Sequence, residues 1–103
     1  MPRRGKIEQM LVHEPDDPFL NFSLAMELVK EGTTDLALER FDRVMTLDAT
    51  YSAAHYHKGN TLIGLGRLDE ARATLERGLE VTEQAGDDHA HREMQELLAT
   101  IAG

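Results

Sequence analysis

Apolar residues recur along this chain at spacings of three and four, which predicts amphipathic α-helices. The pattern and its breaks place six helices, at residues 4–13, 18–31, 34–47, 52–65, 68–84 and 87–102. The last helix shows the pattern plainly, because Ala90, Met94, Leu97, Leu98 and Ile101 fall on a single stripe. The sequence therefore predicts an all-α fold.

Residues that begin and end helices stand at the expected boundaries. Asp17-Pro18 places a capping carboxylate before a proline that suits a first helical turn. Gly32 and Gly66 stand where two helices are expected to end, and Asp87 and Asp88 offer an N-cap to the last one. These signals divide the chain into short helices joined by tight turns.

The chain also repeats itself when it is shifted by 34 residues. Small residues then meet small ones and large residues meet large ones, in the pairs Ala25/Gly59, Leu28/Leu62, Gly32/Gly66, Asp35/Asp69, Ala37/Ala71, Phe41/Leu75 and Arg43/Arg77. This period and this order of residue types resemble the tetratricopeptide repeat (TPR). In the repeat pattern, Asn21 and His55 stand at the tryptophan position, Ala49 and Glu83 at the proline position, and Lys58 at an expected leucine.

The resemblance implies a short right-handed α-solenoid of antiparallel helix pairs, folded as one domain over residues 1–103. Repeat 1 would span 18–51 and repeat 2 would span 52–85, with half-repeat helices at 4–13 and 87–102 closing the two ends. Small residues such as Gly59 and Ala71 would let the two helices of a repeat approach closely. In strict register Arg92 and Glu93 would fall at core positions, so we expect the last helix to be displaced by about one residue.

The first helix of each repeat is apolar on two sides, whereas a surface helix ordinarily has one apolar stripe. Leu20, Leu24, Ala25 and Leu28 form the core side of the 18–31 helix. In TPR proteins the first helices line the concave face, so the resemblance implies a partner-binding groove lined by the opposite side. The residues are Phe19, Phe22, Met26 and Val29, with Ala53, Tyr56, Asn60 and Ile63 one repeat later.

Three occupants of this face stay open from the sequence: a peptide or protein partner, a second copy of the chain in a homodimer, or the chain's own ends. The family's clamp for chaperone C-terminal tails is not expected here. In register its lysine, asparagine and basic positions fall on Phe22, Met26, His57, Asp87 and His91. An apolar or basic segment fits such a face better than an anionic tail.

Composition narrows the function further. The 19 acidic against 11 basic side chains give a net charge of −8, which repels nucleic acid and anionic membranes. The chain has no cysteine, no signal-peptide pattern and no run of 18 apolar residues. We therefore expect a cytoplasmic adaptor or scaffold with no membrane or nucleic-acid partner.

Chemistry other than binding finds little support in the sequence. His55 and His57 lie one repeat before His89 and His91, but residues two apart on a helix point in different directions and no third ligand is fixed by spacing. We interpret them as exposed histidines and pair His89 with Glu93 on the surface. No nucleophile with a base and no phosphate loop is present, so we predict no catalytic residue, no metal site, no cofactor and no enzyme activity.

Overall fold

The computed structural model describes residues 2–102, which contain helices and turns only. The helices are α1 (Pro2–His13), α2 (Pro18–Lys30), α3 (Thr34–Leu47), α4 (Ser52–Gly64), α5 (Leu68–Ala85) and α6 (Asp88–Ala99). The all-α prediction is confirmed, and α2 to α5 lie within one residue of their predicted bounds. The chain separates into two compact units between Ala49 and Thr50, next to the predicted boundary between the repeats.

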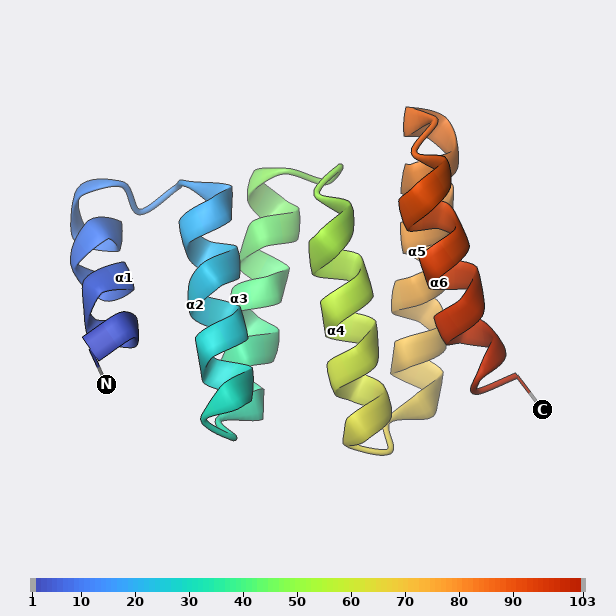
Figure 1. The fold of residues 1–103 in the computed structure, drawn as a ribbon, viewed down its shortest axis with the longest axis horizontal. Coiled ribbons are helices and arrows are strands. Elements are labelled where there is room, and N and C mark those ends of the chain that lie inside the picture. Colours follow the sequence, from blue (N-terminus) through green and yellow to red (C-terminus); the bar gives the residue numbers. More distant parts are fainter. Residues whose placement is uncertain (1, 103) are drawn as a thin grey trace. The chain divides into compact units, whose positions relative to one another are not determined.

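Each unit has three helices. In unit 1, α2 packs against both α1 and α3, and the chain reverses direction at each turn (Figure 1). In unit 2, α5 packs against both α4 and α6, so that α4 and α6 run in the same direction on one side of α5 (Figure 1). The α4 and α6 helices also contact each other, less extensively than either contacts α5.

The core of each unit consists of apolar side chains, which include the predicted core positions Leu20, Leu24, Ala25 and Leu28. Unit 1 buries Ile7 and Leu11 of α1 with Leu20, Leu24, Ala25, Leu28, Ala37, Leu38, Phe41 and Val44. Unit 2 buries Ala54, Leu62, Ala71, Leu75, Val81 and Met94. Burial of these side chains is the main favourable contribution to the stability of each unit.

The helix ends use the predicted residues. The Asp17 carboxylate accepts a hydrogen bond of 2.9 Å from the Leu20 amide, and Pro18 fills the first turn of α2. The Asp87 carboxylate accepts one of 3.1 Å from the Ala90 amide at the start of α6. Gly32 and Gly66 follow α2 and α4 with φ of +80° and +75°, a conformation in which a side chain would be strained.

The close approach of helices predicted at Gly59 and Ala71 involves Leu75 as the side chain nearest to the glycine. A Cβ on Gly59 would lie 2.6 Å from Cδ2 and 2.7 Å from Cγ of Leu75, which is one turn beyond Ala71 on α5. Both Gly59 and Ala71 are buried. The angle at which α4 crosses α5 decides which side chain faces the glycine, and the repeat pattern does not contain that angle.

The α6 helix has the predicted one-residue displacement. Met94 is fully buried whereas Arg92 and Glu93 are exposed. A Cβ on Gly78 of α5 would lie 2.5 Å from the Met94 sulfur, so the glycine makes room for this methionine. The helix ends at Ala99, three residues before the predicted end, because Thr100 and Ile101 donate hydrogen bonds only three residues back, to Leu97 and Leu98.

A buried asparagine replaces the repeat pattern's tryptophan in unit 1. Asn21 has no exposed surface, and its amide nitrogen donates to the carbonyls of Pro15 at 3.0 Å and Asp17 at 2.9 Å. Its carbonyl oxygen accepts a hydrogen bond of 2.8 Å from Arg40. These three bonds join the turn before α2 to α3 and satisfy a polar group that would otherwise be costly to bury.

Two arginines near the N-terminus attach α1 to α2. Arg4 donates to the Glu31 carboxylate at 2.7 Å, and Arg3 lies 3.2 Å from Glu27. The hydrogen bond that Arg4 donates to Glu31 raises the pKa of the Arg4 guanidinium. Both arginines at this end therefore have partners within unit 1, an arrangement that sequence reasoning missed.

Candidate functional site

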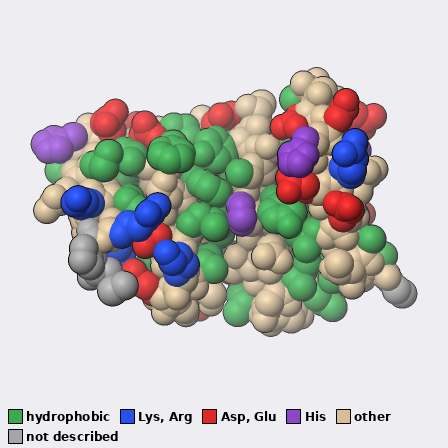
Figure 2. All heavy atoms as spheres, in the orientation of Figure 1, with side chains coloured by type: hydrophobic (Ala, Val, Ile, Leu, Met, Phe, Trp, Pro, Cys, Tyr) green, Lys and Arg blue, Asp and Glu red, His purple; other side chains and the backbone are tan. Residues whose placement is uncertain are grey.

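The outward side of α2 carries a stripe of apolar residues that unit 1 leaves partly uncovered. Phe19 is 63% exposed, while Phe22, Met26 and Val29 are half-buried. In Figure 2 hydrophobic side chains gather over α2 and the neighbouring part of α1. The four predicted residues of this helix thus form a continuous apolar strip that water still reaches.

Phe22 also supports the core of unit 1, although it was predicted on the side of the helix opposite the core. Its ring centroid lies 6.1 Å from that of the fully buried Phe41, with the rings tilted by 54°. Aromatic pairs at such distances contribute to stability. Phe19, which is more exposed, is therefore the better residue for testing the surface without disturbing the fold.

The outward side of α4 carries the other four predicted residues. Ala53, Tyr56 and Ile63 are half-buried, whereas Asn60 is exposed. The Tyr56 ring meets the His57 ring edge-on, with centroids 5.2 Å apart and planes at 80°. This strip is more polar than the one on α2, since an amide and an imidazole accompany its apolar side chains.

Within unit 2 a hollow of about 380 Å³ lies between α4 and the beginning of α6. The α4 helix contributes two of the predicted residues, Ala53 and Tyr56, together with Ser52 and His57. The side from α6 and the residue before it consists of Asp87, His89, Ala90, Glu93 and Met94. The two helices run in the same direction over α5, so both present their first turns to this hollow.

The electrostatics of the hollow are dominated by carboxylates. Asp87 and Glu93 line it, and Glu93 lies 3.4 Å from the exposed His89 imidazole. Burial lowers the pKa of His57 below its ordinary value, and the negative charge of Glu93 opposes that shift without cancelling it. His57 is therefore neutral at pH 7, and the hollow is negatively charged.

The prediction of exposed histidines is wrong for three of the four. His55 is buried, because it takes the tryptophan position of the repeat pattern and its Cβ lies 2.9 Å from where a Cβ on Gly78 would be. His57 and His91 are half-buried, and His91 Nδ1 lies 2.9 Å from the Thr82 hydroxyl. His89 alone matches the prediction, including its pairing with Glu93.

Metal-binding residues do not converge in the part of the chain that the structure describes, where no group of three His, Asp or Glu side chains could hold an ion. From residue 2 to residue 102, no helix combines the length and the apolar character that crossing a membrane requires. What the surfaces offer chemically is apolar contact, hydrogen bonding and negative charge.

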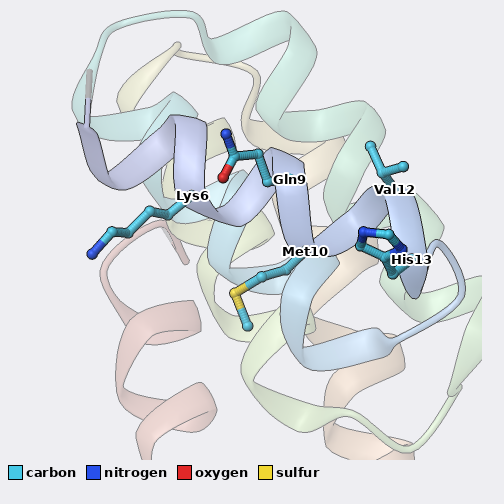
Figure 3. Close-up of a pocket in the computed structure, with 5 residues that line it drawn as sticks. All are labelled: Lys6, Gln9, Met10, Val12 and His13. Carbon is cyan, nitrogen blue, oxygen red and sulfur yellow. The ribbon is translucent and has the colours of Figure 1, made fainter.

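A second hollow, of about 570 Å³, lies on α1. All of its lining residues, Lys6, Gln9, Met10, Val12 and His13, come from this one helix. Figure 3 shows Lys6 and Met10 extending from one side of α1 while Val12 projects from another. It is an open surface of a single helix, in contrast to the hollow with two walls in unit 2.

Sequence reasoning missed that Asp87, His89, Ala90 and Glu93 line the same hollow as Tyr56. The signal was present: adding 34 to Ala53 and Tyr56 gives Asp87 and Ala90. The repeat register therefore places the beginning of α6 beside the beginning of α4.

Comparison with known proteins gives one consistent answer. The family model described as tetratricopeptide repeat matches residues 28–101. The TPR repeat-containing protein PA0015 of Pseudomonas aeruginosa is 32% identical over 95 residues, which cover 92% of this chain and 90% of that protein.

Solved structures agree in fold. The solution structure of BPP2914 from Bordetella parapertussis has a TM-score of 0.83 at 31% identity, over 95% of this chain and 85% of that one. The type III secretion translocator chaperone SycD of Yersinia enterocolitica has a TM-score of 0.87 over 95% of this chain and 75% of its own, at 18% identity. The likeness to SycD concerns the fold alone.

Proposed function

The chain belongs to the tetratricopeptide repeat family, and from this premise we propose that it binds a peptide or protein segment along the outward sides of α2 and α4. TPR domains generally mediate protein–protein interaction. The finer proposal assigns the contact to Phe19, Phe22, Met26, Val29, Ala53, Tyr56, Asn60 and Ile63, in an adaptor or scaffold role. A cytoplasmic location and the absence of enzyme activity stay predictions of the sequence.

The observation that carries this proposal is the exposed apolar strip on α2. Phe19 is 63% exposed and continues into the half-buried Met26 and Val29, although the opposite side of the same helix already supplies the core of unit 1. Aromatic side chains that water reaches are common anchors in protein interfaces. On α4, Tyr56 and Ile63 offer a second strip of the same kind.

Site-specific photo-crosslinking in the source cell tests the proposal. A photoreactive residue is placed at Phe19 and, separately, at Asn60, both of which are exposed on the outward sides of the first helices. Matched control positions are Glu39 on α3 and Glu80 on α5, which are exposed on the second helices. We expect the same protein to be captured from Phe19 and Asn60 and not from the controls.

The mass of the adduct separates the two occupants that the sequence left open. An adduct of twice the chain's mass, together with a dimer in sedimentation equilibrium, would show self-association through this face. Capture of a partner only from Glu39 or Glu80 would move the interaction to the second helices and contradict the proposal.

A further inference from the structure

The hollow between α4 and α6 combines carboxylates with apolar walls and has no lysine or arginine among the described residues that line it. Asp87 and Glu93 supply the charge, while Ala53, Tyr56 and Ala90 supply apolar and aromatic surface. All of these residues belong to unit 2, so the hollow is complete within one compact unit.

The charge of the hollow favours a cation. Asp87 and Glu93 are both acidic, and the His57 imidazole, whose pKa burial lowers, adds no positive charge at neutral pH. His89 has an 83% exposed side chain on the rim, and the Glu93 side chain that it contacts is 49% exposed. The protein as a whole carries a charge of −8, which adds long-range attraction for a basic partner.

An anion would be favoured only if the beginnings of the helices governed the site. Helix N-termini attract anions through their unpaired amides. At α6 this position is already taken, because the Asp87 carboxylate accepts the hydrogen bond from the Ala90 amide. At the beginning of α6, an incoming phosphate or carboxylate would therefore have to displace a side chain of the same charge.

The walls favour arginine among cations. The alanines at positions 53 and 90 and the Tyr56 ring can cover an aliphatic stem, as long basic side chains commonly require. An aromatic ring also attracts a guanidinium over its face. Planar guanidinium groups bind carboxylates through two parallel hydrogen bonds, whereas the ammonium of lysine acts as a point charge.

We propose that the hollow between α4 and α6 binds an arginine side chain of the partner segment, with its guanidinium at the Asp87 and Glu93 carboxylates and its stem against Tyr56. This assignment rests on the proposed function and adds a chemical preference to it. The partner segment would then combine apolar residues for the strip on α4 with a basic residue for this hollow.

Titration of the full-length ¹⁵N-labelled protein with defined peptides tests the assignment. The probe is a capped five-residue peptide with arginine between two leucines, and its matched partner has citrulline, a neutral isostere, in place of arginine. We expect the arginine peptide to shift the amide resonances of Tyr56, His57, Ala90 and Glu93. The citrulline peptide should bind about fivefold more weakly or worse, since it loses the charge-assisted hydrogen bonds.

Two variants with the same change of net charge test whether the carboxylate in the hollow is the one that binds the arginine peptide. Glu93→Gln removes a carboxylate of the hollow, whereas Glu96→Gln removes an exposed one on the same helix outside it. Glu93→Gln should weaken the arginine peptide by about fivefold or more, and Glu96→Gln by less than about twofold. Circular dichroism of both variants confirms that α6 is retained.

Several results would overturn the assignment. These are no shifts at millimolar peptide, equal affinity of the arginine and citrulline peptides, or equal weakening by Glu93→Gln and Glu96→Gln, which would show nonspecific attraction. The failure is distinguishable from failure of the proposed function. Crosslinks from Phe19 and Asn60 that persist in Glu93→Gln at unchanged partner affinity would refute the arginine site and leave the binding face intact.

Discussion

Replacing Gly59 with alanine should destabilise the protein, although the same change ordinarily stabilises a helix. A Cβ at this position would lie 2.6 Å from Cδ2 and 2.7 Å from Cγ of Leu75, about 1 Å closer than the usual contact between carbon atoms. Leu75 is fully buried, and Cγ is the branch point of its side chain, so rotation of a methyl group does not relieve the overlap. Either the side chain leaves its preferred rotamer or α4 moves away from α5.

The magnitude follows from two opposing contributions to the free energy of unfolding. Overpacking a buried contact costs about 1–3 kcal/mol. Alanine gains about 0.5–1 kcal/mol over glycine in a helix interior. The net loss is about 0–2.5 kcal/mol, and each kcal/mol lowers the Tm of a domain of this size by about 4–8 °C.

Urea denaturation followed by circular dichroism measures the effect, with Gly64→Ala as the matched control. Gly64 ends the same helix, and a Cβ there would meet nothing within 4 Å. The control should leave the free energy of unfolding unchanged or raise it by up to about 1 kcal/mol. Opposite signs for two identical substitutions in one helix isolate the contact with Leu75 from helix propensity.

A double-mutant cycle tests whether Leu75 causes the destabilisation. Leu75→Ala alone should cost about 2–5 kcal/mol, because it leaves a cavity. In that background Gly59→Ala should stabilise the protein, since its methyl group enters the cavity instead of meeting a side chain. Destabilisation by Gly59→Ala of the same size in both backgrounds would show that Leu75 is not the cause.

The sequence was sufficient for the helices, because their end signals are local. Asp17, Pro18 and Gly32 act within a few residues of their own position, so their roles follow from residue type and order. The 34-residue shift also shows which helices of the two repeats correspond to each other. It also revealed the displacement of α6, because strict register would have buried Arg92 and Glu93.

The contacts between helices could not be derived in the same way. The neighbour of Gly59 depends on the angle between α4 and α5, and Asn21 is satisfied by groups 4, 6 and 19 residues away, including Arg40. A polar residue at the tryptophan position shows that the chain departs from the repeat pattern there. It does not show which hydrogen bonds the polar residue makes. The pairing of Phe22 with Phe41 is another property of packing, and it left Phe19 as the more exposed aromatic.

Of the candidate site, the sequence predicts the strips on α2 and α4 but not the hollow between α4 and α6. The outward strips on α2 and α4 follow from helical periodicity, but the hollow requires two helices on the same side of a third. The carboxylates of Asp87 and Glu93 had been assigned separately, one to a helix cap and one to a surface pair. Both assignments hold, and the structure adds that the two residues face a common space with Tyr56.

Three further substitutions test the remaining contacts. Asn21→Ala should lower the free energy of unfolding by about 1–3 kcal/mol, because it leaves buried groups unpaired, whereas Asn60→Ala, at an exposed position, should change it by less than about 0.5 kcal/mol in the same urea titration. Met94→Ala should cost about 2–5 kcal/mol and lower the Tm, since the side chain is fully buried against Gly78. The last test concerns pH. Because the folded-state pKa of His57 is lowered below the unfolded value of 6.5, the folded protein binds fewer protons at this residue than the unfolded chain. The contribution of His57 to stability is therefore complete above pH 6.5 and is lost as the pH falls through the folded-state pKa. His57→Asn should therefore flatten the fall in Tm between about pH 6.5 and pH 5 relative to the wild type. His13→Asn, at the exposed end of α1, should leave that fall unchanged. An identical slope in His57→Asn and the wild type would mean that burial does not disfavour the charged imidazole.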